Sequence, residues 1–400
     1  MGMNQTPASE RVHISFFGKR NAGKSSVINA VTGQDLAIVS QVKGTTTDPV
    51  YKTMELLPLG PVVVIDTPGI DDEGELGKLR IRKSYQVLNK TDVALLIVDG
   101  TAGRQPEDEM LIRRFQDKEI PYLVVYNKMD LMEGEPSCGE DEMWVSAKEK
   151  KNIWELKERI AQLGKQEESD KRIVSDLMKS GDFLVLVVPI DKAAPKGRLI
   201  LPQQQTIRDI LDGNGSAIVV KEDGLKDALE KLGQPPRLVI TDSQVFDSVA
   251  KDTPRDVPLT SFSILFARYK GDLAEAVRGV KAVDSLQSGD RILIGEGCTH
   301  HRQCDDIGTV KIPRWLKERA GCELEFDFTS GTEYPDDLSP YRMIVHCGGC
   351  MLNAREMRYR VQCAVDQGIP ITNYGILIAY LRGILERSVE PFPEILRLLK

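Results

Sequence analysis

An eight-residue stretch near the start of the chain, Gly18 to Ser25, matches the pattern of glycines, lysine and hydroxyl residue that binds nucleotide phosphates. Glycines permit a tight loop whose backbone N–H groups surround phosphate oxygens at the N-terminus of a helix. We expect Lys24 to contact the β- and γ-phosphates and Ser25 to bind Mg²⁺. Residues 12–17 read as a strand and the residues after the loop as a helix, as this interpretation requires. The predicted phosphate-binding residues are Ala22, Gly23, Lys24, Ser25 and Ser26.

A second apolar strand, over residues 62–66, leads into an Asp-x-x-Gly motif formed by Asp66 and Gly69. Asp66 is expected to hold Mg²⁺ through a water molecule. Gly69 is expected to sense the γ-phosphate, which places it with Lys24 among the predicted catalytic residues. Both motifs follow strands, and ligands of parallel sheets bind at the carboxyl ends of the strands.

Two further motifs indicate which base is bound. Asn127-Lys128-x-Asp130 follows a buried strand, and Ser146 and Ala147 lie in the segment Val-Ser-Ala-Lys at 145–148. The carboxylate of Asp130 can accept two hydrogen bonds from N1 and N2 of guanine, a donor pair that adenine lacks. The N–H of Ala147 is expected near the guanine O6. Four motifs in this order predict a domain that binds GTP and GDP.

The segment GKRNAGKSSVINAVTG resembles the phosphate-binding loop of the TrmE–Era–EngA–YihA–septin class of GTPases. In members activated by potassium, K⁺ takes the place of an arginine finger. The resemblance implies that Asn21, Ser40, Val42 and Thr45 coordinate K⁺, the middle ones through backbone carbonyls. It also implies that Thr46 is the switch I ligand of Mg²⁺ and takes part in catalysis.

Ile70 follows the Asp-x-x-Gly motif where Ras-like proteins carry a catalytic glutamine. Isoleucine cannot orient water, so we expect slow intrinsic hydrolysis. K⁺, another residue of this loop or a partner chain would then accelerate the reaction. Glu73 and Glu75 are candidates for positioning water, although acidic loop residues are usually only solvated.

A second group of chemically active residues lies far downstream. Cys298 and His300 follow a predicted strand over residues 291–296, and His346, Cys347 and Cys350 follow another that starts near residue 341. If the strands are parallel, their carboxyl ends bring both motifs to the same edge. Thiolates and imidazoles are ligands of zinc and of iron–sulfur clusters.

Three interpretations of these cysteines stay open from the residues alone. First, the thiols could be small buried core residues. Second, they could be ligands of a metal site, either a Cys₃His zinc site or an iron–sulfur cluster. Third, Cys347 and Cys350 could form a redox-active dithiol. The dithiol leaves Cys298 and the histidines without a role. Cys322 and Cys363 lie in predicted strand and helix segments, where core positions are more common.

The segments GEGCTHHRQCDDIGTVKIPRW and HCGGCMLNAREMRYR, behind a potassium-type GTPase domain, resemble the HydF family of FeFe-hydrogenase maturation GTPases. The resemblance extends over the whole chain. It implies a 4Fe-4S cluster on Cys298, Cys347 and Cys350. It also implies a fourth cluster position with a variable ligand, for which the candidates are His300, His346 and Asp305. Cys304 lies outside the family pattern, and its role stays open.

By the same resemblance, the chain is a scaffold and carrier. It would receive a di-iron precursor from the radical-SAM enzymes HydE and HydG and deliver it to apo FeFe-hydrogenase. GTP hydrolysis would switch the contacts with these partners. A homodimer in the cytoplasm is the implied form.

Two other functions remain as alternatives. One is an RNA-modification or ribosome-assembly GTPase with a zinc module, and the other is a redox-sensing GTPase. The net charge of −7 and the lack of a basic, aromatic stripe make nucleic acid an improbable main ligand. Metal content separates the three functions.

The elements that position these residues predict an α/β protein. We expect a P-loop G domain with a doubly wound, mostly parallel sheet and two smaller α/β domains. The predicted divisions are a GTP-binding domain at 1–168, a dimerisation domain at 175–260 and a cluster-binding domain at 261–400. The composition, 41% hydrophobic and 28% charged, is typical of a folded chain. We expect no signal peptide, and no apolar run reaches the roughly 18 residues of a membrane span.

Overall fold

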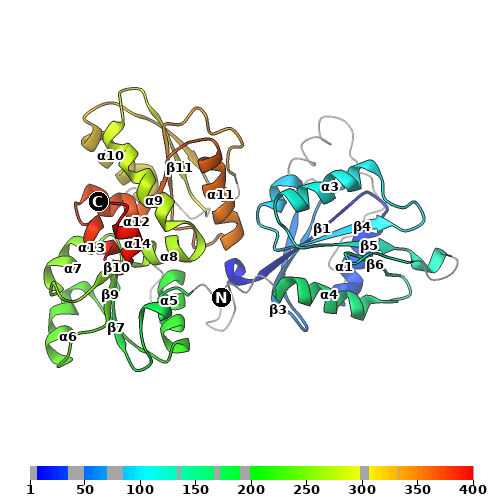
Figure 1. Cartoon of the computed structure of the whole chain (residues 1–400), viewed down its shortest axis with the longest axis horizontal. Helices are drawn as coiled ribbons and strands as arrows, with labels where there is room; N and C mark the ends of the chain where they lie inside the picture. The colour runs from blue at the N-terminus through cyan, green and yellow to red at the C-terminus, as the bar shows by residue number, and fades with distance from the viewer. Residues whose placement is uncertain are drawn as a thin grey trace. The chain divides into compact units, whose positions relative to one another are not determined.

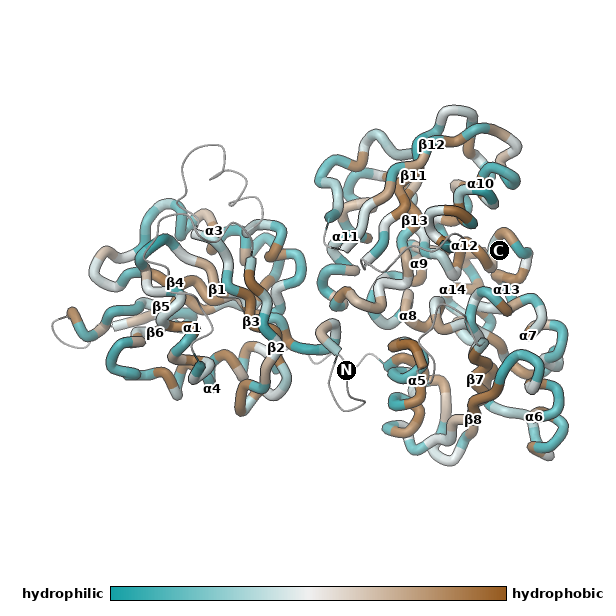
Figure 2. Tube along the Cα trace, turned by 180° about the vertical axis from the view of Figure 1, so that it is seen from behind, coloured by the Kyte–Doolittle hydropathy of each residue, from teal (hydrophilic) through white to brown (hydrophobic). Residues whose placement is uncertain are grey.

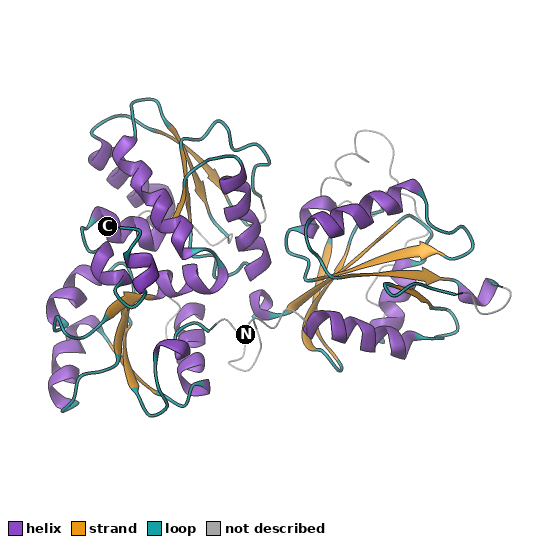
Figure 3. Ribbon diagram, viewed as in Figure 1, coloured by secondary structure: helices purple, strands orange, loops and turns teal. Residues whose placement is uncertain are grey.

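The computed structural model describes residues 7–34, 49–69, 84–132, 137–165, 172–189, 199–297, 306–331 and 333–399. The chain forms two compact units, Met1–Ser169 and Asp170–Lys400 (Figure 1). In each unit helices flank strands (Figure 3). Within the described residues, no helix has the length and apolar character needed to cross a membrane.

The first unit contains a six-stranded sheet in the order β2-β3-β1-β4-β5-β6. All neighbouring strands are parallel except the pair β2 and β3. The strands are β1 (Val12–Gly18), β2 (Val50–Leu56), β3 (Gly60–Asp66), β4 (Val93–Asp99), β5 (Tyr122–Asn127) and β6 (Glu142–Trp144). The described helices are α1 (Lys24–Thr32), α3 (Pro106–Asp117) and α4 (Ile153–Lys165).

Helices cover both faces of this sheet. Successive residues of a strand point to opposite faces, so Phe16 packs against α1 and α4 while Phe17 packs against α3. Figure 1 shows α3 on one side of the strands and α1 with α4 on the other. The inner strands β1, β3, β4 and β5 are therefore apolar on both faces, as is typical of buried parallel sheets, whereas the edge strand β2 is largely exposed. This arrangement confirms the predicted doubly wound sheet.

The second unit contains two parallel four-stranded sheets. The first has the order β10-β9-β7-β8. Its strands are β7 (Phe183–Val187), β8 (Ser216–Val220), β9 (Leu238–Thr241) and β10 (Leu259–Ser261), and the helices between them are α5 (Leu201–Asp212), α6 (Leu225–Lys231) and α7 (Phe246–Asp252). The sequence of the apolar run at 183–190 is compatible with a core strand and with a subunit contact. Its described part, β7, is a buried central strand.

The second sheet carries the cysteine motif and has the order β12-β11-β13-β14, all parallel. The strands are β11 (Arg291–Gly295), β12 (Glu325–Thr329), β13 (Met343–His346) and β14 (Ile371–Asn373). The helices that follow β10 along the chain are α8 (Phe262–Lys270), α9 (Leu273–Val280), α10 (Ile312–Ala320), α11 (Ala354–Asp366), α12 (Tyr374–Leu381), α13 (Leu385–Val389) and α14 (Pro393–Leu396).

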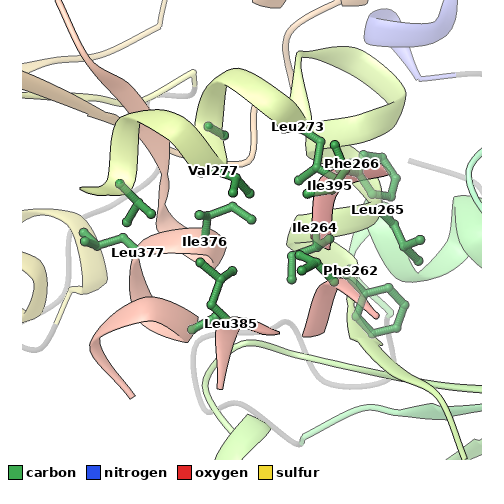
Figure 4. Packing of buried hydrophobic residues seen from close by; sticks show 14 of the residues in the cluster. Phe262, Ile264, Leu265, Phe266, Leu273, Val277, Ile376, Leu377, Leu385 and Ile395 are labelled. Atoms are coloured by element: carbon green, nitrogen blue, oxygen red, sulfur yellow. The ribbon is translucent and has the colours of Figure 1, made fainter. Parts of the chain in front are cut away.

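The two sheets of the second unit share one hydrophobic core. Leu184 and Ile240 of the first sheet belong to the same buried cluster as Ile292 and Val345 of the second. Figure 4 shows how α8, α9 and α12 contribute the side chains in the middle of this cluster. In Figure 2 the apolar colour runs along strands such as β7 and β11. A shared core favours one folding unit, so the predicted division near residue 260 stays a proposal.

The fold class is as predicted, with a P-loop G domain and further α/β regions. From the sequence, residues 216–220 and 237–241 read as strands and residues 202–212 as a helix, and the structure forms β8, β9 and α5 there. The short strand β10 was not anticipated. Its three residues run directly into α8, and the helical pattern of the longer segment conceals them.

Candidate nucleotide and cysteine sites

The phosphate-binding loop connects β1 to α1 with the expected geometry. Asn21 and Gly23 have positive φ values of 62° and 83°, and α1 begins at Lys24. Such a turn directs consecutive backbone N–H groups to one side, where they can bind an anion. A Cβ atom on Gly23 would lie 2.2 Å from Nδ2 of Asn127. This close approach, together with the positive φ, explains the glycine.

The predicted Mg²⁺ and phosphate ligands lie together. The parallel pairing of β1 with β3 sets Phe16 opposite Asp66, and Nζ of Lys24 is 3.2 Å from Oδ1 of Asp66. Lys24 also donates a hydrogen bond to the carbonyl of Thr67. Ser25 is the second residue of α1, and Gly69 lies three residues after β3. The loop and the end of β3 thus form one polar edge.

The guanine-binding motifs are joined by direct hydrogen bonds. Nδ2 of Asn127 donates to the carbonyl of Ala22 at 3.1 Å, and the N–H of Ala147 donates to Oδ1 of Asn127 at 3.1 Å. Oγ of Ser146 donates to Oδ1 of Asp130 at 2.7 Å. Asn127 therefore ties the phosphate-binding loop to the base-binding segment, and Ser146 orients the carboxylate that is expected to read guanine.

Charge and hydrogen bonding favour the ionised form of Asp130. The hydrogen bond from Ser146 is the largest cause that lowers the pKa of Asp130, and Lys148 and Lys128 add to it. Lys128 also forms an ion pair with Asp99 at the end of β4. Burial raises the pKa of Asp99, but the hydrogen bonds from Lys128 and Thr101 outweigh it and leave that pKa lowered. Sequence reasoning missed Asp99, although it ends an apolar strand as Asp66 does.

Several predicted residues of this site lie outside the described residues. They are the switch I candidates for K⁺ and Mg²⁺ together with the three residues considered for the position of the hydrolytic water: Ser40, Val42, Thr45, Thr46, Ile70, Glu73 and Glu75. Of the four predicted K⁺ ligands, only Asn21 is described, and it is exposed.

In the second unit, β11 and β13 bring the two cysteine motifs to one edge. The strands are parallel neighbours, and the N–H of Cys347 donates to the carbonyl of Gly295 at 2.8 Å. The N–H of Gly297 donates to Sγ of Cys347 at 3.0 Å. Gly297 directly precedes Cys298 in the sequence. The sulfur of Cys347 therefore contacts the backbone that leads into the other motif.

The turn after β13 has the features expected around a thiolate. A second N–H, that of Gly349, points to Sγ of Cys347 at 3.4 Å, and Gly349 has a φ of 61°. Backbone N–H groups directed at cysteine sulfurs are a feature that tunes iron–sulfur clusters. Neither Cys347 nor Cys350 forms a disulfide bond. Burial raises the pKa of Cys350, and the positive charge of Lys270 partly opposes this effect.

The remaining predicted ligands, Cys298, His300 and Asp305, and also Cys304, lie outside the described residues. Among the residues that the structure describes, no three His, Cys, Asp or Glu side chains form a group that could hold a metal ion. Cys322 and Cys363 pack against hydrophobic clusters, as expected of core thiols. The described half of the site thus supplies two thiols and their N–H donors.

His346 is 1% exposed, and both of its ring nitrogens have partners. Nε2 lies 3.0 Å from Nη1 of Arg360, and Nδ1 lies 2.7 Å from the carbonyl of Cys347. Arginine can only donate, so Nε2 accepts and Nδ1–H donates to the carbonyl. Burial, with the charge of Arg360, lowers the pKa of His346 to about 3. No ring nitrogen is left for a metal ion, which counts against His346 as the fourth cluster ligand.

Arg360 is the centre of a buried charged network that sequence reasoning missed. Its side chain is fully buried and lies 2.9 Å from the carboxylate of Glu356, which is 6% exposed. It also donates to the carbonyl of Gly331 at 2.7 Å, and its guanidinium lies over the ring of Tyr334. The spacing of Glu356 and Arg360 by four residues on a helix was the available signal. Their burial against β13 could not be read from it.

The larger part of the chain matches two models of one known protein family. Residues 173–271 match the model described as the hydrogen maturase F dimerization domain. Residues 274–391 match the model described as the hydrogen maturase F tetramerization domain. Together these adjoining matches cover more than half of the chain. This chain belongs to the hydrogen maturase F family. The cysteine turn lies inside the region named for tetramerization, so its role in cluster binding stays a prediction.

The first unit of this hydrogen maturase F protein is a GTPase domain, since residues 13–128 match the family described as 50S ribosome-binding GTPase. The tRNA modification GTPase MnmE of Thiobacillus denitrificans is 33% identical over 154 residues, which are 38% of this chain and 34% of that protein. MnmE of Legionella pneumophila strain Paris is 36% identical over 157 residues, with 38% and 35% covered. This chain thus spans about a third of the length of these relatives.

Among solved structures, a crystal structure of Aquifex aeolicus Era shares 21% sequence identity with this chain. The likeness covers 52% of this chain and 92% of that chain, with a TM-score of 0.35.

Proposed function

We propose that this hydrogen maturase F protein is a GTP-hydrolysing scaffold that holds a 4Fe-4S cluster and carries a di-iron precursor to apo FeFe-hydrogenase. Family membership supports the role in hydrogenase maturation. The GTPase domain supports nucleotide binding and hydrolysis. The proposed cluster ligands are Cys298, Cys347 and Cys350.

One observation carries the proposal for a shared metal centre, namely the 3.0 Å hydrogen bond from the N–H of Gly297 to Sγ of Cys347. It puts the sulfur of one motif against the residue before the cysteine of the other. N–H donors stabilise negative charge on sulfur, as metal-bound thiolates require. Zinc would be served by the same donors, so metal identity rests on the family.

A cluster bound by three thiolates supplies an iron atom with one exchangeable position. The chain's own residues would hold its other positions and shape the edge around it. Because His346 is engaged by Arg360 and by the carbonyl of Cys347, the fourth position would be left to His300, to Asp305 or to a ligand from outside the chain. An exchangeable position suits a carrier, since it permits a di-iron cargo to bind and leave.

In the GTPase domain, we assign the phosphates of GTP and GDP to the loop and Lys24, Mg²⁺ to Ser25, Asp66 and Thr46, and guanine to Asp130 and Ala147. The 3.2 Å contact between Lys24 and Asp66 supports the first two assignments. K⁺ bound by Asn21, Ser40, Val42 and Thr45 would stand in for an arginine finger. GTP would order the switch loops, and hydrolysis would release them and alter partner contacts.

The proposed partners are the radical-SAM enzymes HydE and HydG as precursor donors and apo-hydrogenase as acceptor. A homodimer is the proposed assembly, and the dimerization and tetramerization names of the matched regions support oligomerisation without deciding the number of subunits. The cytoplasm is the proposed location, since it offers the reducing conditions that free thiols need.

A transfer assay tests this function. The chain is produced with HydE and HydG, purified anaerobically and mixed with apo-hydrogenase, and hydrogen evolution is measured. We expect activation by the wild type and by Cys322→Ala, whose thiol lies against the core. We expect none by Cys347→Ala. Activation by Cys347→Ala equal to that of the control would overturn the carrier role.

A further inference from the structure

Lys270 is a lysine whose side chain lies inside the second unit. It is the last residue of α8 and is 1% exposed. Its Nζ donates to the carbonyl of Leu352 at 3.1 Å and lies 3.4 Å from the carbonyl of Cys350. These two carbonyls belong to the end of the cysteine turn, about 80 residues further along the chain. A buried ammonium group thus contacts the segment that is proposed to hold a metal centre.

We propose that Lys270 is a positioning residue for the cysteine site, which fixes the end of the turn and raises the reduction potential of the cluster held there. This inference rests on the proposed function, because it assumes that Cys347 and Cys350 bind an iron–sulfur cluster. It adds a residue to the site that carries no metal-binding atom.

The anchoring part follows from the rigidity of α8. Ser261 caps the helix, with its side chain accepting the N–H of Ile264. Ile264 and Leu265 are completely buried in the shared core, so α8 presents Lys270 from a fixed scaffold. Lys270 therefore holds the carbonyls of Cys350 and Leu352 from the side of α8. Asn353, the residue after Leu352, is fixed at the start of α11, where its side chain accepts the N–H of Glu356.

The electrostatic part follows from burial. Charges interact more strongly in a protein interior than in water, because the interior is less polarisable. The ammonium group of Lys270 is buried and lies 3.4 Å from the carbonyl of Cys350, so its charge lies beside the cysteine turn. One-electron reduction adds one negative charge to the cluster and breaks no bond. A nearby fixed cation stabilises the reduced form, so the potential rises.

The experiment compares three variants of the full chain, reconstituted with iron and sulfide under anaerobic conditions. Lys270→Met removes the charge and the hydrogen bonds, and Lys270→Gln removes the charge while keeping a donor. Lys281→Met is the control, since Lys281 also donates to a carbonyl, that of Leu398, but is exposed and lies outside the cysteine turn. Dithionite supplies the electron, and EPR follows the reduced cluster during a redox titration.

We expect both Lys270 variants to be about tenfold harder to reduce, which corresponds to about 59 mV for a one-electron couple. The control is expected to match the wild type. The second readout is alkylation of the metal-free thiols by iodoacetamide. It should be fastest in Lys270→Met and slower in Lys270→Gln, in which a donor still holds the turn.

The outcomes separate the two proposals. A wild type that binds no iron would overturn the proposed function. A wild-type cluster whose potential is the same in both Lys270 variants would overturn this inference alone, as would an equal shift in Lys281→Met. If Lys270→Met does not fold, Lys270→Gln decides the potential.

Discussion

The nucleotide site and the cysteine site use the same topological position but differ in what surrounds them. Each lies where two parallel strands end, β1 with β3 in one unit and β11 with β13 in the other. In the second unit the N–H groups of Gly297 and Gly349 face the sulfur of Cys347, and in the first unit the N–H groups of the loop are predicted to face phosphates. We therefore propose two unrelated kinds of chemistry at the same edge of a parallel sheet.

The difference lies in the charged side chains. At the nucleotide site Lys24 and Asp130 are partly exposed, as suits a ligand that exchanges. Beneath the cysteine site Arg360 is fully buried, and Lys270 is nearly so. We therefore expect substitutions at the nucleotide site to weaken ligand binding. Substitutions of the buried charges beneath the cysteine site should also lower the free energy of unfolding.

The largest effect is expected from Arg360→Met. The substitution leaves the carboxylate of Glu356 buried without its charge partner and removes the donor to His346. Breaking a buried ion pair in this way costs about 3–5 kcal/mol. Urea unfolding of the second unit measures the loss.

The matched control is Arg358→Met, two residues away on the same helix and exposed. It should change stability by less than about 0.5 kcal/mol. The double variant Glu356→Gln with Arg360→Met should recover part of the loss, because it no longer buries an unpaired carboxylate. Equal stabilities of Arg360→Met and Arg358→Met would contradict the buried network.

Next in size is Lys24→Ala, which removes the cation expected at the β- and γ-phosphates. A hydrogen bond to a charged group contributes about 1.5–3 kcal/mol, so GTP should bind roughly 10- to 100-fold more weakly. Calorimetric titration with GTP measures the affinity. Lys19→Ala is the control in the same loop, since Lys19 pairs with Glu107 of α3 instead. Similar losses in both variants would argue against the assigned role of Lys24.

A smaller effect is expected at the base. Asp130→Asn replaces the carboxylate that is expected to accept two N–H groups of guanine. The affinity for xanthine nucleotides relative to GTP should therefore rise by about tenfold, or about 1.4 kcal/mol. Ser146→Ala should weaken GTP binding less than Asp130→Asn does, because Ser146 only orients the carboxylate of Asp130. Competition between the two nucleotides is the measurement. Unchanged selectivity in Asp130→Asn would remove the assignment of this residue.

The smallest effect concerns the monovalent cation. Replacing Na⁺ by K⁺ should speed GTP hydrolysis by roughly two- to tenfold, about 0.4–1.4 kcal/mol of barrier. The increase should vanish in Asn21→Ala, because Asn21 is a predicted K⁺ ligand. Phosphate release at constant ionic strength gives the rates. Identical rates in both salts would refute the potassium site.

The sequence predicted the nucleotide site well because its residues lie in contiguous motifs at strand ends. Gly23, Lys24, Asp66 and Asn127 could each be assigned from local spacing, and the parallel sheet then brings them together. The same reasoning predicted that strands β11 and β13 would carry the cysteine motifs to one edge. Local pattern sufficed wherever the chemistry follows directly from a strand.

The surroundings of the cysteine turn could not be predicted in this way. Lys270 reaches Leu352 from a helix 82 residues earlier, and Arg360 contacts His346 only because α11 packs on β13. In the sequence both are charged residues within helical segments, and such side chains are usually exposed to solvent. His346 looked like a metal ligand because it adjoins Cys347, whereas its hydrogen bonds assign it to the buried network.

The metal content of the chain decides between the proposed cluster and its alternatives. Iron, sulfide and zinc are measured after anaerobic reconstitution, with EPR after reduction, on the wild type, Cys322→Ala and a Cys347→Ala/Cys350→Ala variant. We expect about four irons per chain in the first two proteins and no reduced-cluster signal in the last. Stoichiometric zinc, or no metal in the wild type, would contradict the cluster and favour a zinc-bearing or thiol-based GTPase.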